Sequence, residues 1–357
     1  MHKKLHYFDL IKLSYLPNKA INKLRHLCIK ALDLNEFLSL PTVENELAKI
    51  AHGVIEQDYN FIIANDIEII TFFSPSYPKY FKNISHFPIM FYAKGNLDLL
   101  QGNLLAIVGS RSPNLNNIKL VEDLCDYLNH FNLVLISGMA KGIDSVVHLN
   151  AKNTIAVIGT GLKQCYPREN KYLMDRLSDE QLIISEYPIN MAPMKMNFPK
   201  RNRIIAALAE LVIIIEAKIN SGSISTANFA LSYNKDIFAV AGHPYDYKVM
   251  GTNKLIKDGA NMLLDFAEVI EVLNQKIKVE RFFNEVEPSI KKNIKINKVV
   301  KTHKEVLNYV AADGVEFEDL ISKLNMDTAE LNEILAELEL EDFIYQDEFG
   351  KIYKRVN

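Results

Sequence analysis

The sequence predicts an α/β protein in which helices cover a parallel sheet, with a helical module before the sheet and a winged helix after it. Three observations support this prediction. Short β-branched apolar runs alternate with amphipathic segments from about residue 104 to residue 265. Leucines and isoleucines recur at roughly helical spacing within residues 1–76. Beyond a lysine-rich stretch, three helical patterns are followed by a hairpin pattern.

Seven apolar runs are the expected strands of the sheet. Because these runs are continuous rather than alternating, we expect both faces of each strand to be buried. A further strand is expected at residues 89–92, within a proline-containing lead-in. The seven runs are residues 104–109, 133–137, 155–159, 182–185, 211–217, 237–241 and 262–264.

The helical module is expected to span residues 1–76, and the sheet domain residues 77–275. A turn at Pro17-Asn18 divides the first periodic leucines into two helices. The outline is that of a helix-hairpin-helix module, but the glycine that such a DNA-binding hairpin usually has is absent from this turn. We therefore expect a structural or weakly interacting role for the module.

Residues 276–300 are expected to be a basic linker. Nine lysines and arginines fall within residues 276–304, against three glutamates. A run of this kind favours a solvated tether over a dedicated binding strip.

Residues 301–357 are expected to form the winged helix, with helices at 305–311, 317–324 and 328–340 and a hairpin turn at Phe349-Gly350. In many winged helices the third helix enters the major groove of DNA. Here that helix and its flanks contain seven acidic residues, which would be repelled by phosphates. A packing or protein-binding role is therefore favoured.

Composition and charge exclude several classes of protein. With 357 residues, 48% hydrophobic and 24% charged, the chain is typical of globular proteins of two or three domains. A net charge of -3 excludes attraction of nucleic acid by bulk positive charge, so any anion site must be a local cluster. Cys28, Cys125 and Cys165 are far apart and odd in number, as expected for reduced thiols. No apolar run is long enough for a membrane span, and we expect a cytoplasmic protein.

The segment Phe198-Pro199-Lys200-Arg201-Asn202-Arg203 is the strongest functional signal in the chain. It places three cations at the start of an expected helix, where the helix dipole disfavours positive charge unless an anion is present. There is no acidic residue between Glu186 and Glu210. An anion is therefore expected to bind here. Phe198 suits base stacking, and a core position is an equally supported alternative.

Other strand ends carry glycine-rich turns with basic residues. In an open parallel sheet, ligands bind at the carboxyl ends of the strands, where these turns would meet. Gly109-Ser110-Arg111 offers amides and a guanidinium for phosphate, and the stretch from Ser137 to Asp144 resembles a phosphate cradle. The alternative is that the glycines of this stretch only permit a tight crossing from strand to helix and that Asp144 caps the helix. For Asp144 the cap is the favoured interpretation.

The candidate DNA and phosphate contacts lie at these strand ends and on the basic helix. They are Gly109, Ser110, Arg111, Ser137, Gly138, Lys141, Gly142, Lys171, Lys195, Phe198, Lys200, Arg201, Asn202, Arg203, Ser221, Gly222, Ser223 and Thr226.

Several enzyme motifs are absent from the sequence. There is no Gly-x-x-x-x-Gly-Lys-[Ser/Thr] loop, no Gly-x-Gly-x-x-Gly after a strand and no paired His/Cys spacing for a metal. His148 is expected to be a packed residue rather than a general base, and no nucleophile with its base is evident. We therefore expect no cofactor, no metal and no catalytic residue.

Taken together, the segments resemble the DprA/Smf family of bacterial DNA-processing proteins. The resemblance covers roughly residues 78–265 and includes the turn at Gly109-Ser110-Arg111, the glycine-rich stretch after Ser137, the segment from Phe198 to Ala206, and Ser221-Gly222-Ser223. It implies an extended Rossmann-like core with a positively charged pocket. Arg111, Lys195 and Arg201 would hold phosphates there, and Phe198 would pack against a nucleotide.

The resemblance also implies a function without catalytic turnover. The chain would bind single-stranded DNA without sequence specificity, protect it, form a homodimer and help to load the RecA recombinase in natural transformation and recombination.

The alternative is a nucleotide-processing enzyme similar to the lysine-decarboxylase-like phosphoribohydrolases, which share this sheet. Their Pro-Gly-Gly-x-Gly-Thr-x-x-Glu loop is replaced here by a stretch, 217–235, that contains no carboxylate. Glycosidic hydrolysis would then lack its expected acid or base. A third possibility is a nucleotide-sensing scaffold.

Overall fold

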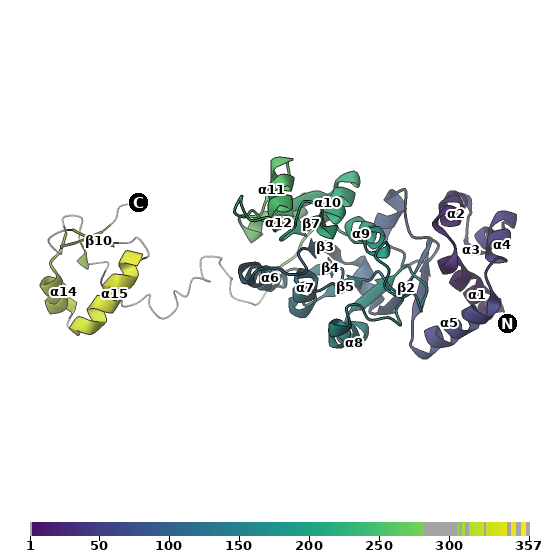
Figure 1. Ribbon diagram of the computed structural model, residues 1–357, viewed down its shortest axis with the longest axis horizontal. Helices are drawn as coiled ribbons and strands as arrows, with labels where there is room; N and C mark the ends of the chain where they lie inside the picture. Colours follow the sequence, from purple (N-terminus) through teal and green to yellow (C-terminus); the bar gives the residue numbers. More distant parts are fainter. Residues whose placement is uncertain are drawn as a thin grey trace. The chain divides into compact units, whose positions relative to one another are not determined.

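The computed structural model describes residues 2–281 and, beyond them, residues 306, 309–310, 314–324, 326–340, 344–347 and 351–354. The chain forms two compact units, Met1–Glu285 and Val286–Asn357. Figure 1 shows the helices and strands of both.

Within residues 2–281, nine strands form one sheet in the order β1-β2-β6-β5-β4-β3-β7-β8-β9. From β6 to β9 all neighbouring strands are parallel, whereas β2 pairs antiparallel with β6 and with β1. The strands are β1 (Glu68–Thr71), β2 (Met90–Gly95), β3 (Asn103–Val108), β4 (Leu133–Ser137), β5 (Thr154–Val157), β6 (Leu182–Ser185), β7 (Leu211–Ile214), β8 (Asp236–Ala239) and β9 (Asn261–Met262).

The predicted fold class is confirmed. Each of the seven predicted runs overlaps a parallel strand, the last of them only at Met262, and the last residues of several runs lie in loops. The lead-in strand is also found, as β2. The prediction missed β1, which lies inside the range assigned to the helical module. This strand has only four residues, too few for a clear sequence pattern, and it is stabilised by its pairing with β2.

Helices cover both faces of the parallel strands, because successive strand residues point to opposite sides. In β3, Leu105 and Ile107 belong to a core with α6 (Leu115–Leu128), α7 (Ile143–Asn150) and α12 (Phe266–Asn274). Leu104 and Ala106 belong to a second core with α8 (Lys171–Glu180), α9 (Asn197–Leu208) and α10 (Gly222–Ser232). The result is a layered α/β domain; α11 (Met250–Lys257) follows β8.

The N-terminal helices gather beside β2, at one end of the sheet (Figure 1). They are α1 (His2–Tyr15), α2 (Asn18–Lys30), α3 (Leu34–Ser39), α4 (Pro41–Leu47) and α5 (His52–Ala64). Leu24, Phe37 and Ile62 share one hydrophobic core with Phe91 and Tyr92 of β2. No break in packing therefore marks residue 76, and the domain boundaries remain predictions.

A buried polar junction joins α2 to the sheet domain. Arg25 donates to the carbonyl oxygen of Phe87 at 2.6 Å, and its Nη2 lies 3.9 Å from the Glu186 carboxylate. Arg203 of α9 forms an ion pair with the other oxygen of Glu186. One carboxylate at the end of β6 is thus shared by guanidinium groups from two different helices.

The C-terminal unit contains α14 (Phe317–Leu324), α15 (Thr328–Leu340) and an antiparallel pair of β10 (Ile344–Gln346) and β11 (Ile352–Lys354). Leu320, Leu335 and Ile344 contribute to its core. These elements confirm the predicted winged helix. The predicted helix at 305–311 lies mostly outside the described residues, as do the turn at Phe349-Gly350 and the linker beyond residue 281.

His148 is fully buried beneath β4 and β5. Its Nδ1 lies 2.7 Å from the Thr154 hydroxyl, which itself donates to the carbonyl oxygen of Leu135. Nδ1 must therefore carry the proton. Burial, together with the charges of the nearby Arg176 and Arg201, lowers the pKa of His148 to about 3. A neutral, packed imidazole agrees with the role expected from the sequence.

This histidine should make the protein less stable in mild acid. The unfolded chain takes up a proton below a pKa of 6.5, whereas the folded chain does so only near 3. The free energy of unfolding attributable to His148 should therefore fall by about 2 kcal/mol between about pH 8 and about pH 5. Urea unfolding of wild type and His148→Leu at both pH values measures the difference. An equal pH dependence in the two proteins would contradict the assignment.

Candidate nucleic-acid interface

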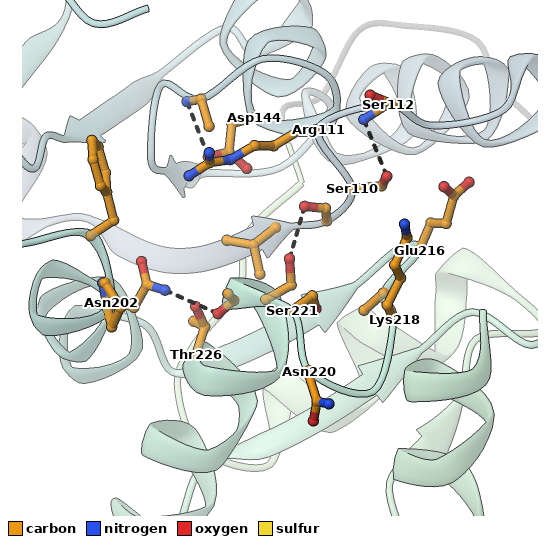
Figure 2. Close-up of a pocket in the computed structure, with 18 of the residues that line it drawn as sticks. Ser110, Arg111, Ser112, Asp144, Asn202, Glu216, Lys218, Asn220, Ser221 and Thr226 are labelled. Atoms are coloured by element: carbon orange, nitrogen blue, oxygen red, sulfur yellow. Dashed lines mark hydrogen bonds between the residues drawn. The ribbon is translucent and has the colours of Figure 1, made fainter. Parts of the chain in front are cut away.

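A cleft of about 960 Å³ lies at the carboxyl ends of the parallel strands. This is the edge of an open α/β sheet where ligands bind. Loops after β3, β4, β5, β6, β7 and β8 and the start of α9 contribute to it. Figure 2 shows labelled side chains from the loops after β3 and β7 around the cleft. The cations that line the cleft are Arg111, Lys195, Arg201, Lys218 and Lys248; the acids are Asp144 and Glu216.

The turn after β3 is held against the start of α7. The amide of Ile143 donates to the carbonyl oxygen of Ser110 at 3.1 Å. Gly142 has a φ of 75°, and a Cβ there would lie 2.3 Å from the same oxygen, so only glycine permits the approach. This geometry presents the exposed side chain of Arg111 at the cleft.

Phe198 forms an aromatic wall with Tyr166. The two ring centroids are 5.3 Å apart, and the guanidinium carbon of Arg111 lies 5.6 Å from the centroid of Phe198. A Cβ at Gly159 would come within 3.0 Å of the Phe198 ring, so glycine gives that ring its space. Phe198 is partly buried and also lines the cleft. It therefore has features of both alternatives from the sequence, a core position and a ring that a base can reach.

Arg111 and Lys195 are the cleft cations that remain available to a ligand from the predicted set. Both side chains are exposed. Among the residues that the structure describes, neither forms an ion pair or a side-chain hydrogen bond. The guanidinium of Arg111 contacts the face of Phe198 and its charge acts on Asp144 and Arg201, and none of these interactions occupies its N–H groups.

Arg201 occupies a different environment from the one expected. It is only 4% exposed, and its Nη1 donates to the carbonyl oxygens of Gly138, at 2.6 Å, and Val157. A Cβ at Gly138 would lie 2.7 Å from both Arg201 Nη2 and Asp144 Oδ2. The guanidinium therefore fills the space that Gly138 leaves, next to the Asp144 carboxylate.

The pKa values of Arg201 and Asp144 reflect their burial next to each other. Burial lowers the pKa of Arg201 to about 10, and the Asp144 carboxylate opposes this effect. Burial raises the pKa of Asp144, against the influence of Arg201 and of a hydrogen bond from the amide of Ala140. The expectation that Arg201 holds an external phosphate is thus corrected to a structural role at the base of the cleft.

Apart from Lys141, three cations of the predicted set do not line this cleft. Arg203 is 8% exposed and paired with Glu186 at the junction with α2, so its assignment as a DNA contact is corrected. Lys171 pairs with Asp175 on the surface of α8, and Lys200 lies partly buried on α9. The cations at the start of α9 are in part compensated within the protein, which explains why a helix N-terminus tolerates them.

Lys141 lines a small adjoining pocket of about 60 Å³ that shares Arg111 and Phe198 with the larger cleft. Its ammonium lies 2.6 Å from the Glu169 carboxylate, with both side chains exposed. An exposed pair of this kind contributes little to stability and can exchange partners with a ligand.

Three of the remaining predicted residues are held by internal hydrogen bonds. Ser137 donates to the carbonyl oxygen of Ile107 at 2.7 Å, which leaves its hydroxyl in the sheet. Ser223 donates to the carbonyl oxygen of Gly109, and Asn202 donates to that of Gly222. Those two bonds join the end of β3, α9 and α10 around the cleft. The predicted residues that line the cleft here are Gly109, Asn202, Ser221, Gly222, Ser223 and Thr226.

Two buried polar atoms at this side of the cleft have no partner among the described residues: Glu216 Oε1 and Ser221 Oγ. The other oxygen of Glu216 accepts from the amide of Asn114 and the side chain of Asn117, at 3.0 and 2.8 Å. Glu216 thereby ties the end of β7 to the start of α6, just beyond the turn that carries Arg111.

Sequence reasoning did not include Tyr166, Lys218, Tyr247 and Lys248 among the site residues, although all of them line the cleft. Each lies in a loop after a parallel strand, and that position was the signal in the sequence that could have identified them.

Over the described part of the chain, no group of three or more His, Cys, Asp or Glu side chains is placed to hold a metal ion. None of the helices described there is long and apolar enough to span a membrane.

Comparisons with known proteins identify the family of this chain. Residues 68–274 match the family model described as DNA recombination-mediator protein A, and residues 298–348 match the DprA winged helix domain. The DNA processing protein DprA of Streptococcus pneumoniae is 41% identical over 54% of this chain and 70% of its own length. The corresponding protein of Bacillus subtilis is 37% identical over 59% of this chain and 72% of its length.

Solved structures give the same result. The X-ray structure of DprA from Streptococcus pneumoniae superposes with a TM-score of 0.64 and 32% identity, covering 77% of this chain and 97% of that one. A structure of DNA processing protein A from Helicobacter pylori, described as showing a single-stranded DNA binding mode, has a TM-score of 0.55 and 29% identity. It covers 59% of this chain and 97% of its own. The chain belongs to the DprA/Smf family of DNA processing proteins.

Proposed function

We propose that this protein binds single-stranded DNA in the cleft at the carboxyl edge of its sheet, without preference for base sequence and without catalysis. The observation that carries the proposal is the contact between Arg111 and Phe198, with ring and guanidinium 5.6 Å apart. A strand needs both partners at once, because its phosphates seek cations and its bases stack on aromatic faces.

The surroundings of this pair support the same ligand. Lys195 supplies a second exposed cation, and Tyr166 extends the aromatic wall. A flat aromatic face accepts any base, whereas sequence selection needs hydrogen bonds to base edges. The Helicobacter pylori relative, described as binding single-stranded DNA, supports the choice of nucleic acid.

We propose further that the protein acts as a homodimer in the cytoplasm, protects the bound strand and passes it to the RecA recombinase during DNA uptake and recombination. The support for this step is the matched family, whose description is that of a recombination mediator.

Arg111→Ala should weaken binding to single-stranded DNA of every sequence, because a phosphate contact carries no sequence information. The slope of log affinity against log salt should become shallower by about 0.7, the value for one phosphate contact on a single strand. Titrations of homopolymers at several salt concentrations measure both quantities.

Lys257→Ala is the matched control, since it removes an exposed cation on α11 that does not line the cleft. Its affinity and salt slope should equal those of wild type. If Arg111→Ala also behaved as wild type, the cleft would not be the binding site.

Arg201→Ala should act on stability before it acts on binding. The substitution leaves the carbonyl oxygens of Gly138 and Val157 without their donor and Asp144 without its neighbouring cation. We expect a loss of about 3 kcal/mol or more in the free energy of unfolding, measured in urea. Arg201→Lys should not restore it, because an ammonium lacks the planar fork. Wild-type stability together with weak binding would return Arg201 to the set of direct contacts.

The rival function is hydrolysis of a nucleotide. Of the two carboxylates that line the cleft, Glu216 is bonded to Asn114 and Asn117, and Asp144 adjoins Arg201. The sequence 217–235 contains no acid. Purified protein incubated with nucleoside 5′-monophosphates should therefore release no free base, as followed by chromatography. Base release that is lost in Glu216→Gln would establish the enzyme instead.

A further inference from the structure

The far side of the cleft from Phe198 carries a second aromatic and basic surface. Figure 2 shows Arg111 and Lys218 on different sides of the cleft. Lys218 follows β7, and its ammonium lies 4.5 Å from the ring centroid of Tyr247, in the loop after β8. Both residues line the cleft, and Tyr247 is 58% exposed. We call Tyr247 and Lys218 the β8-side platform.

The loop that carries Tyr247 is built to hold one shape. Asn253 of α11 bonds both the amide and the carbonyl oxygen of Gly242, at 3.0 and 2.9 Å. Within the loop, the amide of Asp246 donates to the carbonyl oxygen of His243, and its carboxylate accepts from the amide of Lys248. An aromatic ring on such a loop loses little conformational freedom when it stacks on a ligand.

One hydrogen bond links the same loop to the turn that carries Arg111. Lys248 Nζ donates to the carbonyl oxygen of Ser112 at 3.0 Å. This hydrogen bond joins the loop of the β8-side platform to the turn of Arg111 along one cleft.

The chemistry of the platform matches that of the first aromatic wall. An exposed tyrosine ring costs free energy in water, and a neighbouring ammonium favours anions. Tyr245, two residues earlier, is 94% exposed and contacts His243, with ring centroids 5.7 Å apart. Exposed aromatic rings interleaved with cations are the pattern with which proteins hold single strands.

We propose that Tyr247, with Lys218, forms a second base-stacking subsite for single-stranded DNA, so that one strand crosses the sheet edge from Phe198 to Tyr247. This inference rests on the function proposed above. Between β5 and β8 there are four strand spacings, about 19 Å in all. A strand that reaches both platforms must contain several nucleotides, and a dinucleotide is too short.

Fluorescence provides a direct test, because the chain contains no tryptophan. In Tyr247→Trp the introduced indole is the only one in the protein, and stacking of a base on it should quench its emission. We expect quenching when the full-length variant is saturated with a long oligothymidine. Tyr172→Trp is the matched control, because Tyr172 is 76% exposed on α8 and does not line the cleft. Its emission should not change.

Affinity provides the second test. Tyr247→Ala should weaken binding of the long oligothymidine by about fivefold or more, the effect of losing one stacked base. Tyr247→Phe should bind as wild type does, and Tyr247→Leu should resemble alanine, since the leucine is apolar but has no aromatic face. Dinucleotide affinity should be the same in all of these variants.

The outcomes separate this inference from the function on which it rests. If the wild type binds DNA through Arg111, but Tyr247→Trp is not quenched and Tyr247→Ala binds normally, the second subsite is wrong and the proposed function stands. If the wild type binds no single-stranded DNA, or Arg111→Ala binds as wild type, both proposals are wrong.

Discussion

The cleft depends on the burial of one guanidinium. Arg201 reaches from α9 to the carbonyl oxygens that end β4 and β5, and it lies against Asp144 at the start of α7. A charged donor removed from water must find acceptors within the protein, and these carbonyl oxygens provide them. Gly138 is required because any side chain there would occupy the place of this group. The positions of Phe198 and Asn202, on the same helix, follow from this anchor.

Charge is divided between two tasks in this domain. Buried guanidiniums hold elements together: Arg201 joins α9 to the strand ends, while Arg25 and Arg203 share Glu186 between α2 and α9. Exposed cations remain for ligands. This division explains how a protein with a net charge of -3 can present a locally positive cleft. It also explains why counting basic residues in a motif overstates the number that can meet a phosphate.

The sequence was sufficient for the parallel strands and the winged helix, because continuous buried runs and helical periodicity are local signals. It was insufficient for β1, whose four residues become a strand only by pairing with β2. It located the turn of Arg111 and the ring of Phe198 correctly at the cleft. It could not distinguish Arg111 from Arg203, since the partner of Arg203 is seventeen positions away along the chain and adjacent only after folding. Tyr247 and Lys218 lie in loops that contain glycine but outside the short motifs that drew attention to the other residues.

The ion pairs at Glu186 have a consequence for how this protein can change over time. The helices before the sheet and the helix that shapes the cleft draw on the same carboxylate, which lies between two groups of like charge. Replacement of the first helices by an unrelated module would remove Arg25 and leave Glu186 paired with Arg203 alone. The N-terminal segment and the cleft are therefore coupled through a carboxylate that the segment does not itself contain.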